Sequence, residues 1–194
     1  MQKFATEIGL SLTDKKVTVE EFWKMINAFN KEIVDPKSNR YFFVKDPVEV
    51  EIANAPSLDI EFDLHADFPE RGKRKANFNG KVLLSKDDFD SLESNKIYRM
   101  IDCCNFTFNQ GKFEFHSTSY GDFKSAENKG SIMHWLPSGS TIPLQVMTLS
   151  GEVIKGVGEV AISNLKQGDI IQFERMFFVK LDSKDDMLFY YLHS

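Results

Sequence analysis

The sequence predicts a mainly β protein of one or two antiparallel barrels, preceded by a short helical segment. Three observations favour this class. Apolar and polar residues alternate with period two in many stretches after Pro47. Turn signals such as Asn109-Gln110-Gly111 and Ser150-Gly151 separate these stretches. Helical spacing of apolar residues is confined to the part before Pro36. Barrels are favoured because closure pairs the edges of a sheet.

The composition is that of a globular protein. The chain has 194 residues, is 42% hydrophobic and contains 18 Phe, which is ample for packed cores. No apolar run reaches about 18 residues and no signal peptide is visible at the start, so we expect a cytoplasmic protein without membrane contact. The only cysteines, Cys103 and Cys104, are neighbours and indicate a reducing environment. The net charge of -5 argues against non-specific binding of DNA or RNA but allows a focused basic site.

Two helices are expected at the start of the chain. The first ends at Gly9 and begins almost at Met1, so we expect the chain to be cut from a longer protein. The second starts at Thr18-Val19-Glu20-Glu21, which has the pattern of a capping box. Asp35-Pro36 should end it, because the residue before proline is pushed out of the helical conformation. Its apolar residues recur at helical spacing: Val19, Phe22, Ile26 and Phe29.

About ten stretches are expected to be strands. Residues 48–52 and 58–64 alternate strictly and carry carboxylates on the outward side, as half-buried antiparallel strands do. The other expected strands are residues 80–84, 97–108, 112–116, 131–136, 143–147, 153–162, 168–182 and 187–193.

The expected strand over residues 168–182 carries a charge on its apolar side. It opens with a Gly168-Asp169 turn, and the odd-numbered positions from Ile171 to Leu181 are apolar except for Arg175. An unpaired buried charge costs several kcal/mol, so we expect Arg175 at a bulge or at a barrel edge. A regular strand points Gln172 and Arg175 to opposite faces, so both can read one ligand only if a bulge or strand end lies between or beside them. Glu174 is expected to brace Arg175, and internal pairing would make Arg175 structural.

Few residues suggest catalysis or metal binding. The histidines are far apart and lack metal-ligand spacing: His65, His116, His134 and His193. No catalytic carboxylate pair, phosphate-binding glycine motif, serine-nucleophile motif or Cys-His pairing stands out. Cys103 and Cys104 are expected on opposite faces of a strand, one in the core and one more exposed. We therefore expect this chain alone to be non-catalytic and without a cofactor.

Two basic features are candidates for RNA contact. The tract Arg71-Gly72-Lys73-Arg74-Lys75 holds two of the five arginines and is either a solvated hairpin tip or a loop that contacts phosphates. Arg40 precedes Tyr41-Phe42-Phe43. It either stacks on or hydrogen-bonds an unpaired base, or it braces the helical part against the first barrel.

Five motifs in chain order resemble the anticodon-binding region of archaeal-type glutamyl-tRNA synthetases. The resemblance covers essentially the whole chain. Glutaminyl-tRNA synthetases share much of the pattern, and the Arg-Tyr-Phe-Phe-Val run favours the glutamyl family. The motifs are Asp35 to Val44 with Asp46-Pro47-Val48, His65 through Phe68-Pro69-Glu70-Arg71-Gly72 with Asn77-Phe78, His134-Trp135-Leu136, Gly156-Val157-Gly158-Glu159, and Gln172-Phe173-Glu174-Arg175.

The resemblance implies two antiparallel β-barrels, the distal inserted in the proximal, after a remnant of a helical connector. The connector remnant would be residues 1–35, the proximal barrel 36–96 and 165–194, and the distal barrel 97–164. A class I catalytic domain that uses ATP to join glutamate to tRNA would precede this chain, which contains neither ATP-binding signature. The chain would then bind tRNA(Glu), or tRNA(Gln) if the parent is a glutaminyl enzyme. The alternative from another class is a β-barrel module that binds protein.

The resemblance also implies site residues. Arg40, Gln172 and Arg175 match family positions near the central and flanking anticodon bases, and Arg99 matches a strand that faces the anticodon loop. The basic tract adds Arg71, Lys73 and Arg74 as further candidates. After the last motif the family usually has an aromatic residue and then glycine, whereas Met176 and Phe177 follow here. We therefore expect the backbone beside Arg175 to differ from the family.

Overall fold

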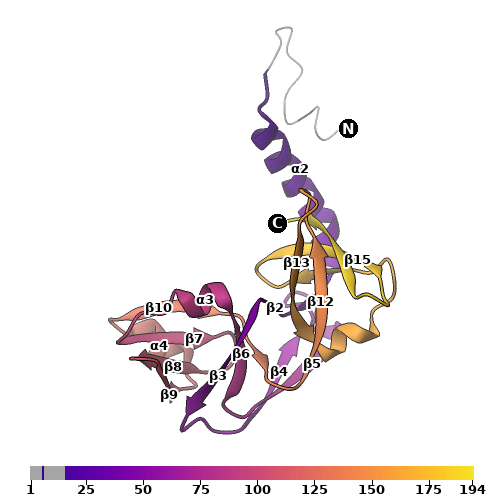
Figure 1. Ribbon diagram of the computed structural model, residues 1–194. Helices are drawn as coiled ribbons and strands as arrows, with labels where there is room; N and C mark the ends of the chain where they lie inside the picture. Colours follow the sequence, from indigo (N-terminus) through magenta and orange to yellow (C-terminus); the bar gives the residue numbers. More distant parts are fainter. Residues whose placement is uncertain (1–5, 7–15) are drawn as a thin grey trace.

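The computed structural model describes residue 6 and residues 16–194. The expected first helix lies outside this part of the chain. The described part has two lobes, each built on one β-sheet, and a helix that projects from one of them (Figure 1). Among the described residues, no helix has both the length and the apolar character needed to cross a membrane.

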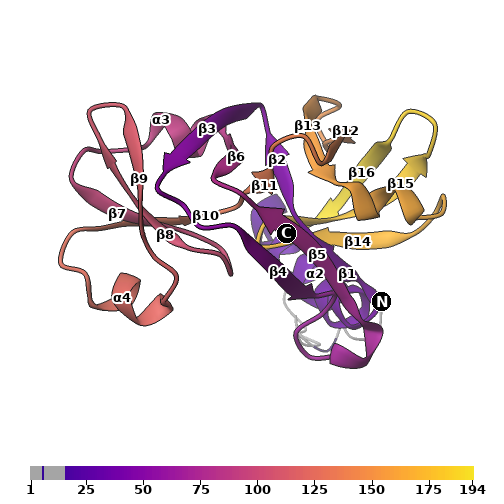
Figure 2. The ribbon, with the colours of Figure 1, turned by 90° about the horizontal axis from the view of Figure 1, so that it is seen from below.

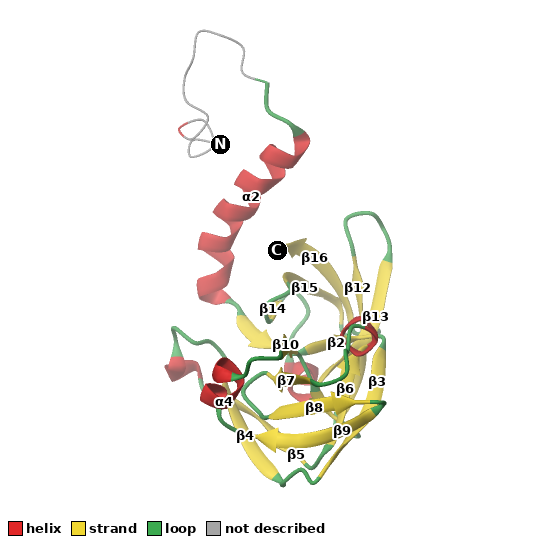
Figure 3. Ribbon diagram, turned by 90° about the vertical axis from the view of Figure 1, so that its left-hand side faces the viewer, coloured by secondary structure: helices red, strands yellow, loops and turns green. Residues whose placement is uncertain are grey.

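Helix α2 spans Val19–Val34 and confirms the second expected helix. The Thr18 hydroxyl accepts a hydrogen bond from the Glu21 amide at 3.1 Å, and the Glu21 carboxylate accepts one from the Thr18 amide at 2.9 Å. This is the expected capping box. A 3-10 turn, η1 (Asp35–Lys37), ends the helix at the expected proline. No residue of α2 is buried, and Figure 3 shows the helix projecting away from the two lobes, although it also contacts strand β16 (Leu188–His193).

The C-terminal lobe is a seven-stranded sheet in the order β1-β14-β15-β16-β12-β13-β2. The β1–β14 and β12–β16 pairs are parallel and the other pairs are antiparallel. A 3-10 turn, η3 (Val160–Asn164), follows β13. The strands are β1 (Asn39–Tyr41), β2 (Phe43–Lys45), β12 (Thr141–Met147), β13 (Val153–Glu159), β14 (Ile170–Phe173), β15 (Phe177–Ser183) and β16 (Leu188–His193).

The middle lobe is a second seven-stranded sheet, in the order β10-β7-β8-β9-β3-β6-β11. Two short helices that we did not expect from the sequence, α3 (Lys86–Asp90) and α4 (Tyr120–Ser125), lie in its connections. The strands are β3 (Pro47–Ala53), β6 (Lys81–Ser85), β7 (Lys96–Met100), β8 (Asn105–Asn109), β9 (Lys112–Ser117), β10 (Lys129–Met133) and β11 (Leu136–Pro137).

A two-stranded ribbon leads from the middle lobe to the start of β1. It consists of β4 (Leu58–Asp63) and β5 (Lys73–Phe78), with a 3-10 turn, η2 (Pro69–Arg71), in its connecting loop. Figure 2 shows the ribbon reaching towards β1 and the end of α2. The Arg40 amide donates to the Leu64 carbonyl at 2.7 Å, which ties β1 to the end of the ribbon.

The mainly β class is confirmed, but the expected closed barrels are not formed within residues 16–194. The edges of one sheet are β1 and β2, and those of the other are β10 and β11. Because only Phe42 separates β1 from β2 in the chain, the C-terminal sheet must curl until its two edges approach each other. The chain then leaves this sheet for β3 of the middle lobe, so β2 ends after three residues and the edges stay unpaired.

The strands are distributed differently from the expected ranges 36–96 with 165–194 and 97–164. Strands β12 and β13, from the range expected for the distal barrel, pair with β16 and β2 in the C-terminal lobe. Strands β3 and β6 belong to the middle sheet together with β7 to β10. Alternation along the sequence locates strands but does not identify their partners, since period two is the same for any pairing.

Residues 41–44 contribute to the cores of both lobes. Tyr41 and Phe43 lie in the hydrophobic core of the C-terminal lobe, whereas Phe42 and Val44 lie in that of the middle lobe. Successive side chains of an extended chain point to opposite sides, which explains four consecutive buried residues. The aromatic residues that follow Arg40 are therefore core residues and do not offer a stacking surface for a base.

Residues 168–182 form a hairpin and not the single strand that we expected. Gly168 has a φ of 93°, consistent with the expected opening turn. Strand β14 ends at Phe173, which pairs with Phe177 at the start of β15. Arg175 lies in the turn between them with a left-handed φ of 59°, so neither a bulge nor a barrel edge explains its position. The three-residue turn keeps the apolar positions odd-numbered on both strands, which hid the turn in the sequence.

Residues 97–108 also fold as two strands where one was expected. Strands β7 and β8 are antiparallel partners, and Cys103 and Cys104 lie in the connection between them. Both cysteines are buried, so the expectation of one exposed thiol is wrong. The pKa of the Cys103 thiol is raised mainly by a hydrogen bond with Cys104 and secondly by burial, so the thiol stays protonated.

Candidate nucleic-acid interface

Arg74 is buried where the ribbon meets the two lobes. It lies in β5, so Lys73, Arg74 and Lys75 belong to a strand. The alternative that placed them at the tip of a hairpin is wrong. Lys73 and Lys75 are exposed, whereas the Arg74 side chain is only 2% exposed. Its guanidinium carbon lies 4.4 Å from the ring centre of Phe42 and 4.8 Å from that of Phe62. Such contacts stabilise a cation that has lost its water.

Two carboxylates balance the charge of Arg74. Its Nη1 donates to Glu159, the last residue of β13, and its Nη2 donates to Glu174 Oε2 at 2.7 Å. The Phe42 amide also donates to Glu159, at 2.6 Å. Burial raises the pKa of Glu159, while the Arg74 charge and the Phe42 amide act in the opposite direction. These contacts join β5, β13 and the turn after β14 through one buried guanidinium.

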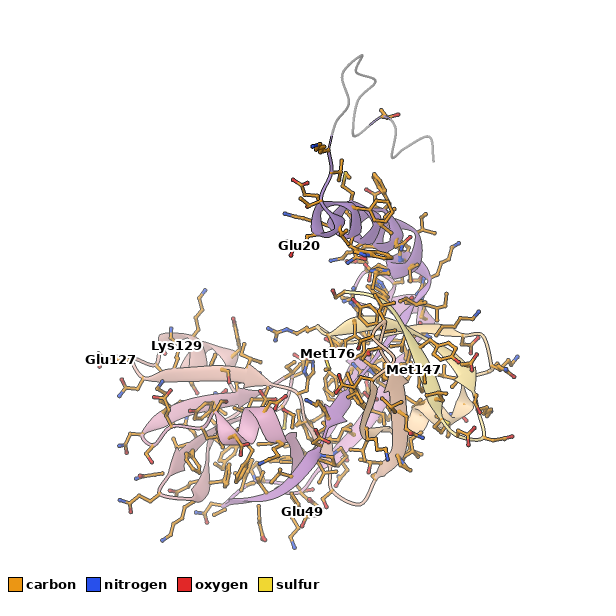
Figure 4. All side chains as sticks on the ribbon, turned by 45° about the horizontal axis from the view of Figure 1, so that its top comes forward. Glu20, Glu49, Glu127, Lys129, Met147 and Met176 are labelled. Carbon is orange, nitrogen blue, oxygen red and sulfur yellow. The ribbon has the colours of Figure 1, made fainter. Side chains whose placement is uncertain are left out.

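His134 lies beside this cluster and contacts the same turn. Its ring packs edge-on against Phe42 with ring centres 5.5 Å apart, and the nearby backbone of Glu174 favours its protonated form. Burial lowers the pKa of His134 to about 4, and the charge of Arg175 acts in the same direction. The imidazole is therefore neutral at pH 7. In the view of Figure 4, Met176 of this turn lies on the side of the C-terminal lobe that faces the middle lobe.

We expect His134 to make the fold less stable as the pH falls from about 6.5 to 4. An unfolded histidine binds its proton near pH 6.5, whereas the folded pKa of His134 is about 4. The unfolded state thus binds more protons in this window, so stability is full above it and decreases as pH falls. Urea denaturation at pH 7 and 4.5 should show a smaller decrease for His134→Gln than for the unmodified chain. An equal decrease would contradict this role, and the exposed His116→Gln is the matched control.

Arg40 and Gln172 lie side by side on neighbouring strands. They are aligned partners in the parallel β1–β14 pair, and such partners project from the same face of a sheet. The opposite face carries Tyr41 and Phe173, which are buried in the core. Arg40 also forms an ion pair with Asp35 at 3.4 Å, and both side chains are 22% exposed. Arg40 therefore makes the bracing contact at the helix end that was one of its two predicted roles.

Arg175 lies at the hairpin tip, directly beyond the strand that carries Gln172, and is exposed. A strand end therefore separates Gln172 from Arg175, which is one of the conditions for both to face the same ligand. Glu174 was expected to brace Arg175, but its carboxylate pairs with Arg74. The amide of Glu174 donates to the Tyr41 carbonyl at 2.9 Å, so the turn is also fixed to β1.

Arg71 and Arg40 both contact the 3-10 turn η1 that follows α2. It donates to the Pro36 carbonyl, and its guanidinium carbon lies 4.5 Å from the ring centre of Phe68. His65 approaches the Asp35 carbonyl at 3.1 Å from the same loop. The loop of the β4–β5 ribbon is thus fastened next to Arg40.

Arg99 and Lys73 have partners elsewhere. Arg99 is buried in the middle lobe, 8% exposed, and donates to Asn105 Oδ1 at 2.9 Å and to the Thr118 carbonyl at 3.2 Å. Its guanidinium carbon lies 5.4 Å from the ring centre of Tyr120. Lys73 is exposed and pairs with Glu61 at 3.2 Å. Within the described part of the chain, neither forms a hydrogen bond or an ion pair with Arg40, Gln172 or Arg175, so their RNA contacts stay predictions.

The five motifs of the sequence meet around Arg74. The first supplies Phe42, the second the loop that leads into β5, the third His134, the fourth Glu159 and the fifth Glu174. Sequence reasoning missed this cluster because it treated Arg74 as one member of a basic tract. Strand geometry would have been a signal, since period two places Arg74 on the opposite face from Lys73 and Lys75.

Two family models match the chain, over residues 38–120 and 132–182. Both are described as tRNA synthetases class I (E and Q), anti-codon binding domain, and together they cover more than half of the chain. The first match includes Arg40, Arg74 and Arg99, and the second includes Gln172 and Arg175.

Curated relatives agree with these models. The chain is 38% identical to the glutamate–tRNA ligase of Pyrococcus abyssi over 191 residues, which are 94% of this chain and 32% of the relative. It is 34% identical to that of Methanobrevibacter smithii over 97% of this chain and 33% of the relative. It is 33% identical to that of Methanothermobacter thermautotrophicus over 100% of this chain and 34% of the relative. The chain spans about a third of the length of these relatives, and it belongs to the anticodon-binding domain family of the class I tRNA synthetases for E and Q.

Proposed function

We propose that Arg40, Gln172 and Arg175 form an anticodon face that binds the anticodon loop of tRNA(Glu). The alignment of Arg40 with Gln172, with the Arg175 turn directly beyond, is the observation that carries this proposal. Proteins usually read unpaired RNA bases by stacking and by hydrogen bonds to the base edges. Two guanidinium groups and one amide offer the planar donors and the acceptor that such reading needs.

The parent protein that we propose is a glutamate–tRNA ligase, as the names of the relatives suggest. A catalytic domain outside this chain would join glutamate to the tRNA with ATP, and this chain would supply recognition in the cytoplasm. tRNA(Gln) is the second candidate partner because the family models cover both E and Q enzymes.

Selectivity on the anticodon face would come from matching one base edge. A wrong base leaves buried polar groups without a partner, which costs about 1 to 3 kcal/mol for each group. The net charge of -5 disfavours general attraction to RNA, so the focused contacts must supply most of the preference.

Titration of the 194-residue chain with two unmodified tRNA transcripts tests this function. One transcript carries a glutamate anticodon and the other a substituted central base. We expect about tenfold tighter binding of the first, as loss of one good base contact is worth about 1 to 3 kcal/mol. Arg40→Lys keeps the positive charge but loses the planar fork, so it should reduce this preference.

The control for Arg40→Lys is Lys112→Arg, an exposed residue of the middle lobe that should leave the preference unchanged. Equal and weak binding of both transcripts by the unmodified chain would contradict the proposed function. In that case a module that binds protein becomes the better description.

A further inference from the structure

The turn that carries Arg175 is held by groups on two other elements. Arg74 of β5 binds the Glu174 carboxylate at 2.7 Å. The Tyr41 carbonyl of β1 accepts the Glu174 amide at 2.9 Å. Both contacts act on Glu174, and neither of them involves the Arg175 side chain.

Within the turn, the Met176 amide donates to the Phe173 carbonyl at 2.9 Å, and Arg175 has its left-handed φ of 59°. Non-glycine residues rarely adopt this conformation unless their surroundings hold it. The arrangement therefore fixes the backbone of Arg175 while its side chain extends into solvent.

We infer that Arg74 is a positioning residue that fixes the Arg175 turn through Glu174 and thereby sets where Arg175 meets the tRNA. This inference rests on the proposed function. It differs from the expectation that Arg74 itself contacts RNA. The Arg74 side chain is 2% exposed, both of its terminal nitrogens bind carboxylates, and two phenyl rings flank it, so phosphate cannot reach it in this arrangement.

The direction in which Glu174→Gln changes the affinity for RNA distinguishes a positioning role from a purely electrostatic one. Glu174→Gln removes a negative charge from the residue next to Arg175. If charge alone mattered, RNA would bind more tightly, because phosphates are repelled by carboxylates. If Glu174 serves to hold the turn, RNA binds more weakly, because the charge-assisted hydrogen bond to Arg74 is lost.

The experiment measures binding of the glutamate-anticodon transcript to the unmodified chain, Glu174→Gln, Arg175→Gly and the double variant. We expect Glu174→Gln to weaken binding about five- to tenfold, and Arg175→Gly by more. In the Arg175→Gly background, Glu174→Gln should cause no further loss, since a positioning residue acts only through the group that it positions. Glu70→Gln, an exposed carboxylate in the ribbon loop, is the control and should not weaken binding.

Arg74→Lys gives a second route to the same result. A lysine keeps the charge but cannot bridge two carboxylates with a planar fork. Thermal unfolding monitored by circular dichroism shows which variants are folded. If Arg74→Lys does not fold, the measurements on Glu174→Gln still test the inference. We expect a similar loss of affinity for Arg74→Lys with an unchanged dependence on salt, because no phosphate contact is removed.

The outcomes distinguish this inference from the proposed function. Tighter binding by Glu174→Gln, or an equal loss in the presence and absence of the Arg175 side chain, overturns the positioning role and leaves the anticodon face intact. Absence of specific binding by the unmodified chain overturns both.

Discussion

Arg74→Met is expected to lower the free energy of unfolding by about 3 to 5 kcal/mol at pH 7, because it removes one partner of a buried ion pair. Glu159 and Glu174 would lose the cation that balances their carboxylates, although their side chains are only 12% and 21% exposed. Methionine fills part of the space between Phe42 and Phe62, so the loss comes mainly from the unbalanced carboxylates. Urea denaturation at pH 7 measures it, with the midpoint and slope fitted together.

Two further variants test this explanation. Lys73→Met removes the neighbouring exposed cation of the same strand, and we expect a change below about 1 kcal/mol because surface ion pairs contribute little. Arg74→Met combined with Glu159→Gln should recover part of the loss. The glutamine carbonyl can still accept the Phe42 amide hydrogen while the buried charge is gone. A double variant as unstable as Arg74→Met alone would show that lost packing, and not charge, causes the effect.

The sequence predicted most strands but not the turns hidden inside two of them. In residues 168–182 a three-residue turn preserves period two, so Ile171, Phe173, Phe177 and Val179 read as one continuous face. In residues 97–108 the connection is itself buried at Cys103 and Cys104, and Asp102, with a left-handed φ of 51°, is the polar turn residue between its buried positions. Local patterns report burial, and they cannot report a reversal that leaves burial unchanged.

The partners of the candidate site residues were not predictable from the sequence. The motifs placed Arg40 and Gln172 near the same ligand, and the β1–β14 register does align them. The partners of Arg74 are 85 and 100 positions away in the chain. Such groups meet only because β5 of the ribbon packs against the end of β13 and the turn after β14. A single sequence contains no signal for contacts of this range.

Arg175→Gly is expected to weaken binding of the glutamate-anticodon transcript by about 1 to 3 kcal/mol and to remove most of the preference over the transcript with a substituted central base. Glycine adopts the left-handed φ of 59° without steric cost, so the turn is kept while the side chain is lost. Arg175→Lys separates charge from base reading, because lysine retains the cation but not the planar pair of donors.

For Arg175→Lys we therefore expect the salt dependence of the unmodified chain together with a reduced base preference. Lys184→Ala removes an exposed cation from the next turn of the same lobe and should change the affinity for both transcripts only slightly. If Arg175→Gly weakens both transcripts by the same factor, the guanidinium contacts phosphate and not a base edge, because phosphate contacts position RNA without reading its sequence. A preference that survives in Arg175→Gly would instead assign base reading to Arg40 and Gln172, the pair whose register β1 and β14 already fix.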